Sequence, residues 1–169
     1  QAIKEVFWNY LSARDAIFMK YWMINLPGSP TEGNSDKPTP SKDCHPTEPL
    51  APCDREQMVK AVTSWNDDGG GTEPIYDGLI LILDSWLAWR QREETGSSLH
   101  ILVVSDEGAQ GVKINIEEVI GRFTDVGNFP TPLEVMIHVF TRPEHFRSYR
   151  ILTELTGGSL HAIGQSEET

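Results

Sequence analysis

Residues 99–106 read LHILVVSD, an apolar run that ends in a hydroxyl and a carboxylate. A run this short, rich in β-branched residues and apolar on both alternating faces, predicts a central strand of a parallel sheet that helices cover on both sides. Ser105 and Asp106 then stand at its carboxyl end. Because ligands of open α/β sheets bind outside the carboxyl ends of the strands, Asp106 is a candidate functional residue. The alternative is that Asp106 only caps or turns the loop at residues 106–111.

Apolar patterns on either side of this run predict alternating helices and strands. Helices are expected at residues 3–11, from 54 to near 66–68, at 75–89, from 115 onward and from 141 to 157–158, and further strands at 15–26, 133–140 and 159–163. Strands and helices that alternate at this spacing form right-handed crossovers. The expected fold is therefore α/β and doubly wound, with a mostly parallel central sheet flanked by helices.

Composition limits the number of domains and the kinds of partner. A chain of 169 residues with 38% hydrophobic content buries one core, so residues 1–169 are expected to form one domain. The 14 Lys and Arg residues against 25 Asp and Glu residues give a net charge of −11. This charge disfavours nucleic acid as a partner and favours a solvated acidic surface or a cation as ligand. No apolar run approaches the roughly 18 residues that span a bilayer, so no membrane span is expected.

A proline-rich segment at residues 27–53 interrupts the pattern and has almost no apolar content. We expect a long surface loop inserted in the domain, because such a segment gains too little burial to offset its ordering. Both cysteines, Cys44 and Cys53, lie in it. Paired, they form a disulfide and imply an oxidising compartment, hence an extracellular, cell-surface or periplasmic protein. Unpaired, with His45 and Asp54 beside them, they are an incidental metal cluster, and a cytoplasmic location stays open.

Several enzyme signatures are missing from the sequence. No G-x-G-x-x-G or G-x-x-x-x-G-K-[ST] glycine pattern occurs, and no G-x-S-x-G nucleophile turn. His100, His138 and His161 all fall within expected strands, where a histidine is more often structural than catalytic. Dinucleotide-binding and serine-hydrolase functions are therefore disfavoured.

Three short motifs, in this order and at this spacing, carry a resemblance to a known family. They are GGT at residues 70–72 before the apolar helix, SDEG at 105–108 after the central strand, and TGG at 156–158 near the end. Together they resemble the von Willebrand factor type A domain family. The resemblance runs from residue 1 to the last strand, apart from the proline-rich insertion, and it implies a three-layer sandwich.

The resemblance also implies a metal-ion-dependent adhesion site at the carboxyl edge of the sheet. Thr72 would coordinate a divalent ion through its hydroxyl, and Asp106 would approach the ion through water. One position would remain for an acidic group of a protein partner. Oxygen ligands of this kind suit Mg²⁺, Ca²⁺ or Mn²⁺. The surrounding binding face would comprise Gly71, Glu73, Ser105 and Glu107.

Two departures from the family pattern matter. The D-x-S-x-S motif, which the family carries on the strand before its first helix, does not occur in this chain, and the family's T-D-G appears as SDEG. The chain opens directly on an amphipathic helix, as a domain trimmed from a longer precursor would, so we expect a sandwich that is incomplete at its N-terminus. Loss of that strand would leave backbone groups of its neighbours unpaired. A preceding segment or a companion chain is expected to supply it.

Three classes of function stay open. The leading one is a non-enzymatic binding or adhesion domain that uses the loops near Thr72 and Asp106. The second is an interaction scaffold of the same fold, with a degenerate metal site, inside a larger assembly. The third is an enzyme that uses Asp106 for phosphoryl transfer, which is disfavoured because no Lys or second acid occupies a recognisable partner position. A D-x-S-x-S motif upstream of Gln1 would select the first class, and its absence the second.

Overall fold

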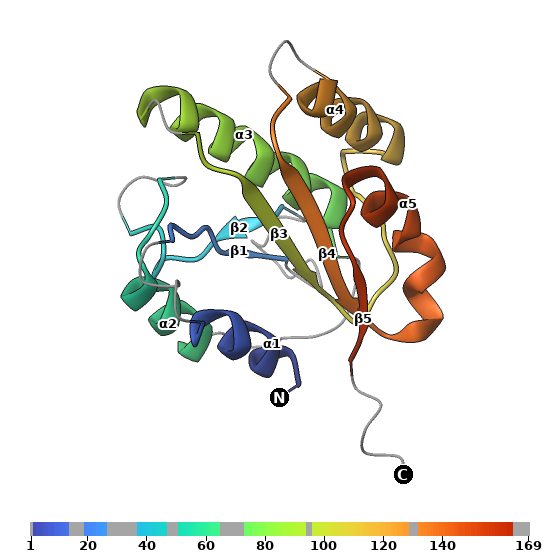
Figure 1. Ribbon diagram of the computed structural model, residues 1–169. Coiled ribbons are helices and arrows are strands. Elements are labelled where there is room, and N and C mark those ends of the chain that lie inside the picture. Colours follow the sequence, from blue (N-terminus) through green and yellow to red (C-terminus); the bar gives the residue numbers. More distant parts are fainter. Residues whose placement is uncertain are drawn as a thin grey trace.

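The computed structural model describes residues 2–13, 19–26, 37–46, 51–64, 73–93, 96–128 and 132–163. Within these ranges, five α-helices accompany a three-stranded parallel sheet and a small antiparallel hairpin (Figure 1). The elements are α1 (Ala2–Leu11), β1 (Ile24–Asn25), β2 (Thr39–Pro40), α2 (Arg55–Ser64), α3 (Ile75–Glu93), β3 (Leu99–Val104), α4 (Ile116–Asn128), β4 (Val135–Thr141), a 3₁₀ turn (Pro143–His145), α5 (Phe146–Thr156) and β5 (Leu160–Ala162). The expected α/β class is confirmed.

The parallel sheet has the order β3-β4-β5. β3 pairs with β4 along its whole length, from Leu99 opposite Val135 to Val104 opposite Phe140. The strand at residues 99–104 was expected at the centre of the sheet, and this is wrong for the described strands, because β4 is central and β3 lies at an edge. The apolar run could not reveal this, since strand order depends on contacts that are distant in sequence.

The free edge of β3 is defined by its hydrogen bonds. The amides of Leu99 and Ser105 donate to carbonyls next to and within β4, at 3.0 and 3.1 Å. Successive residues of a strand alternate in direction. The backbone groups of His100, Leu102 and Val104 therefore face away from β4, toward a side on which the described part of the chain has no further strand.

Helices cover both faces of the sheet, but unequally. Buried side chains of α3, α4 and α5, including Leu83, Trp86, Val119 and Tyr149, pack with the odd-numbered residues of β3 and β4 in the main core. The opposite face carries a smaller cluster, in which Val6 of α1 meets Phe140 and Ile163. His100 and His161 lie exposed on that face, so the expectation of a strand apolar and covered on both sides holds for only part of β3.

A second core lies between α1, α2 and the chain around the cysteines, and Figure 1 shows these two helices side by side. It includes Leu11, Met23, Met58 and Val62 together with a Cys44–Cys53 disulfide. The predicted disulfide is thus confirmed, and it is consistent with an oxidising compartment.

The surface loop expected at residues 27–53 is wrong for Cys44, His45 and Cys53, which are buried, whereas Lys37, Thr39, Lys42 and Pro46 are exposed as expected. Within the segment, β2 pairs with β1 through Ile24 opposite Pro40. Packing against α1, which is distant in sequence, and against α2 supplies the burial that the local composition lacks. Residues 27–36 and 47–50 of that segment are outside the described ranges.

The strand expected at residues 15–26 is shorter than predicted. Only Ile24–Asn25 forms a strand, while Tyr21 makes an isolated bridge to Cys53, and residues 14–18 lie outside the described ranges. The hairpin partner is a two-residue strand next to Pro38, and proline removes ladder donors. The segment is therefore rich in apolar residues, yet its described part forms a strand of only two residues.

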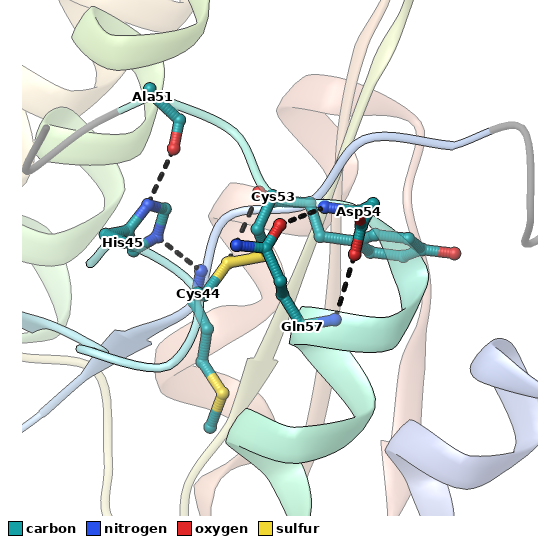
Figure 2. The surroundings of a disulfide bond; sticks show 8 residues. Cys44, His45, Ala51, Cys53, Asp54 and Gln57 are labelled. Carbon is teal, nitrogen blue, oxygen red and sulfur yellow. Dashed lines mark hydrogen bonds between the residues drawn. A yellow bond between two sulfur atoms is a disulfide. The ribbon is translucent and has the colours of Figure 1, made fainter. Parts of the chain in front are cut away.

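Two helix starts that the sequence predicts are confirmed. At α2, Asp54 and Gln57 exchange side-chain to backbone hydrogen bonds of 2.9 and 3.1 Å (Figure 2), and at α4 Asn115 accepts from the amide of Glu118 at 2.9 Å. Helix α3 runs to Glu93 instead of stopping near residue 89, with two arginines in its last turn that suit the negative end of the helix dipole. None of the helices in the described ranges has the length and apolar character to cross a membrane.

His45 ties the disulfide loop to Met23, the residue before β1. Its Nε2 accepts from the Met23 amide at 3.1 Å, and its Nδ1 donates to the carbonyl of Ala51 at 2.8 Å (Figure 2). Because a backbone amide can only donate, Nε2 must be unprotonated, and the ring is neutral. Burial lowers the pKa of His45 below its usual value, and the bond to Ala51 only partly opposes this effect.

We therefore expect acid to destabilise the fold through His45. The unfolded state binds a proton near the ordinary pKa of about 6.5, while the folded state resists it, so the free energy of unfolding falls as the pH drops through that value. The His45→Gln variant keeps a donor and an acceptor but does not titrate. Urea denaturation between pH 8 and 5.5 should give a flatter pH dependence for the variant than for the wild type. Parallel pH profiles would contradict this role of His45.

Candidate functional site

The carboxyl end of β3 brings together three of the candidate residues. Ser105 is buried, and its hydroxyl donates to a carboxylate oxygen of Glu73, which precedes α3. The amide of Glu107 donates back to the Ser105 hydroxyl at 3.0 Å. Glu73, Ser105 and Glu107, residues of the expected binding face, thus meet at one edge of the sheet.

Glu107 joins the two loops at this edge. One carboxylate oxygen accepts from the amide of Glu73 at 3.1 Å and from the side-chain amide of Gln110 at 2.8 Å. Its backbone carbonyl accepts from the hydroxyl of Tyr149 at 2.7 Å. Glu107, the extra acid in the SDEG motif, therefore links the loop after β3 to the start of α3 and to α5.

Tyr149 was not among the candidate residues, although it anchors the site. It is fully buried on α5, and burial raises the pKa of its phenol well above the usual value, with the nearby carboxylates of Glu73 and Glu107 acting in the same direction. The phenol therefore stays a neutral donor. Its helical position on the core face predicts an apolar role, and only the spatial proximity of Glu107 reveals the polar one.

A second anchor that the sequence did not reveal is Asp77. Its two carboxylate oxygens accept from the amides of Val112 and Lys113 at 2.8 and 2.9 Å, which fixes the far end of the loop after β3 to the first turn of α3. At the end of β4, Thr141 is fully buried, and its hydroxyl has no hydrogen-bond partner within the described residues. Both side chains belong to the same edge as Ser105, because parallel strands end on one side.

Asp106 differs from its neighbours. It is exposed and takes part in no hydrogen bond or ion pair within the part of the chain that the structure describes. Neither Asp106 nor Glu107 has a lysine or arginine partner in that part. Asp106 and Glu107 therefore present negative charge that no lysine or arginine of the described chain pairs with. The alternative role for Asp106, capping the loop, receives no hydrogen bond in its support.

The donor atoms at this edge are carboxylate and hydroxyl oxygens, the kind that Mg²⁺, Ca²⁺ and Mn²⁺ prefer. Gly71 and Thr72, which the resemblance places at the ion, lie outside the described ranges, so the expected pairing of Thr72 with Asp106 stays a prediction. Within those ranges no group of three or more His, Cys, Asp or Glu side chains is arranged to hold a metal ion. The Ser105 hydroxyl makes two hydrogen bonds to protein groups, which an ion would have to rearrange.

Comparisons with known proteins add no assignment. No protein-family model, curated protein or solved structure matches the chain.

Proposed function

We propose that the chain is a non-enzymatic binding domain that resembles the von Willebrand factor type A family. In this proposal the carboxyl edge of the sheet recognises an acidic group of a protein partner through a divalent cation. The observation that carries the proposal is the cluster of Glu73, Ser105 and Glu107 at the end of β3, with the exposed Asp106 between Ser105 and Glu107 in the sequence. Carboxylates concentrated at one edge raise the local concentration of cations.

The three acids make different contacts, and this difference supports the proposal. Glu73 and Glu107 hold the loops through hydrogen bonds to Ser105, Gln110 and backbone amides, so they shape the edge. The carboxylate of Asp106 makes no hydrogen bond or ion pair within the described protein, so it can approach an ion directly or through water. Mg²⁺, Ca²⁺ or Mn²⁺ would supply the positive charge that links the acidic edge to an acidic partner.

The Asp106→Ala variant tests the proposal. We expect the affinity for Mg²⁺ and Mn²⁺ to fall at least about tenfold, because the exposed Asp106 carboxylate makes no hydrogen bond within the described protein and can coordinate the ion. Its stability should stay within about 0.5 kcal/mol of the wild type, since an exposed side chain contributes little packing. Calorimetric titration with each ion measures the affinity, and urea denaturation the stability.

A matched control is Asp125→Ala, which removes the same charge from an exposed position on α4. We expect it to bind the ions as the wild type does. Equal affinity in the wild type and in Asp106→Ala, or no binding in either, would overturn the cation-dependent function.

A second candidate is an interaction scaffold of the same fold with a degenerate metal site. The Ser105 hydroxyl favours it, because both of its hydrogen bonds stay within the domain. The free edge of β3 at His100, Leu102 and Val104 gives such a scaffold a place for a strand from a preceding segment or a companion chain. The same titration separates the two candidates, because the scaffold binds no Mn²⁺ in the wild type.

A further inference from the structure

Three histidines and a serine form a hydrogen-bonded series across all three strands, on the sheet face opposite α3, α4 and α5. Nδ1 of His100 on β3 lies 3.2 Å from Nε2 of His138 on β4. Nδ1 of His138 lies 3.0 Å from the hydroxyl oxygen of Ser159, and this oxygen lies 2.7 Å from Nε2 of His161 on β5. This histidine series therefore links β3 and β5, the two outer strands of the described sheet, to β4 through side chains.

The first contact of the histidine series is an N–H···N hydrogen bond. The ring planes of His100 and His138 are parallel within 3° and the ring centroids lie 5.5 Å apart, so the two nitrogens meet head-on. A neutral imidazole has one donor and one acceptor nitrogen, whereas an imidazolium has only donors. The contact therefore needs one proton between the two nitrogens. Two charged rings would turn two N–H groups toward each other, and the bond would be lost.

Ser159 restricts the rest of the series in the same way. Its hydroxyl carries one proton, so it donates to only one of its two histidine neighbours and must accept from the other. When both bonds are made, either Nδ1 of His138 or Nε2 of His161 is protonated, but not both.

Together these conditions limit the charge that the intact histidine series can hold. If His138 is neutral with its proton on Nδ1, His161 must stay neutral, and His100 can bind an extra proton. If that proton is on Nε2, His100 must stay neutral, and His161 can bind the extra one. If His138 is itself charged, both of the other rings must be neutral. A second extra proton therefore breaks at least one of the three hydrogen bonds.

We propose that the histidine series is a pH-sensitive switch, which holds β3 and β5 on β4 while at most one of the three imidazoles is charged and opens when a second becomes charged. Histidine changes its charge between about pH 8 and pH 5, so acid is the trigger. The closed form binds one extra proton, whereas three separated histidines bind up to three. The free energy that keeps the switch closed therefore falls as the pH drops. The switch is independent of the proposed function at the carboxyl edge.

The electrostatic surroundings of the switch agree with this limit. Burial lowers the pKa of His138 below its usual value, and the charges that His100 and His161 carry when protonated lower it further. No carboxylate of the described residues contributes to this shift in pKa. Helix α1 also packs on this sheet face. Of its charged side chains, Lys4 donates to a backbone carbonyl of α2, and Glu5 is exposed.

The switch is connected to the cluster that holds α1 on the sheet. His161 stacks on Phe140, with ring centroids 4.5 Å apart. Phe140 packs with Val6 of α1 and with Ile163, and the ring of Tyr10 on α1 meets it edge-on with centroids 6.2 Å apart. Because β5 has only three residues, loss of the side-chain bonds should loosen this strand first.

Hydrogen exchange at pH 7.5 and pH 5.5, corrected for the intrinsic exchange rates, tests the switch. The reporters are the amides of Val139 and Ile163, whose hydrogen bonds of 2.8 and 3.0 Å join β4 to the chain around β5. We expect acid to lower their protection at least about tenfold more than that of the α2 amides. Helix α2 is the internal reference because it packs with Cys44 in the second core, so titration of the neighbouring His45 would loosen α2 as well.

The His138→Gln variant removes the ring that takes part in both limits, while glutamine keeps a donor and an acceptor. We expect the extra loss of protection in acid to shrink below about threefold in this variant. The matched control is His145→Gln, which removes a histidine outside the series, in the turn before α5. It should keep the pH dependence of the wild type.

A second measurement counts the protons in the wild type and needs no variant. Titration of the imidazole signals by nuclear magnetic resonance follows His100, His138 and His161 separately. We expect the second proton to bind at least about one pH unit below the first, because the three rings titrate as a coupled group. The proposal is wrong if the three rings titrate independently, if the β4 and β5 reporters lose no more protection than α2, or if His138→Gln keeps the wild-type pH dependence.

Discussion

Replacing Gly158 with alanine is expected to cost about 3–5 kcal/mol of stability, a large effect for one methyl group. A Cβ at this position would stand 1.8 Å from the carbonyl oxygen of Ile137 and 2.6 Å from its carbonyl carbon. Ile137 is fully buried in the central strand β4, so its backbone cannot retreat without opening the sheet. Urea denaturation of Gly158→Ala against the wild type measures the loss.

The neighbouring Gly157 provides the control for this prediction. It ends α5 in the left-handed conformation with φ of 71°, but no atom lies within 4 Å of its would-be Cβ. Gly157→Ala should therefore cost only the backbone penalty of about 1–2 kcal/mol. Equal losses in the two variants would show that the close approach to Ile137 is not what requires glycine at position 158.

The features that sequence reasoning predicted correctly are local ones. The helix starts at Asp54 and Asn115 depend on side-chain caps to residues three positions on, and the end of α5 at Gly157 depends on the backbone of one turn. The strands at residues 99–104 and 135–141 follow from short apolar runs. These signals lie within one element, so no knowledge of its neighbours is needed.

The features that sequence reasoning missed depend on contacts between distant elements. Cys44 packs with α1, α2 and Met23, and His45 bonds to the Met23 amide, and none of these contacts is visible in a proline-rich composition. The edge position of β3 depends on strand order. The approach of His100 to His138 depends on the register that sets Leu102 opposite His138, and a slip by one residue would turn one ring to the other face.

The candidate site combines both kinds of signal. The clustering of Glu73, Ser105 and Glu107 could be predicted, because the carboxyl end of a strand and the start of a neighbouring helix meet at one edge of an α/β sheet. The hydrogen bonds that these three residues make could not be predicted, because they depend on side-chain distances. Tyr149 gave no signal at all, because a buried aromatic residue on a helix resembles any other core residue.

Removing the disulfide is expected to have the second large effect. The Cys44→Ala/Cys53→Ala variant should lose about 2–4 kcal/mol, because the bond between residues nine apart limits the unfolded chain. Folded-state contacts depend on the same loop: Cys53 exchanges two backbone hydrogen bonds of 2.8 Å with Tyr21, and His45, next to Cys44, holds Met23. Urea denaturation with and without a thiol reductant measures the loss.

Reduction and substitution should converge, since both remove the same constraint. We expect reductant to destabilise the wild type by about as much as the double substitution does, and to leave the double variant unchanged. Because both cysteines are almost fully buried, at 1% and 2% exposed, thiols must be counted by alkylation in denaturant without reductant, followed by intact mass. Two alkylated thiols in native, unreduced protein would refute the bond and remove the argument for an oxidising compartment.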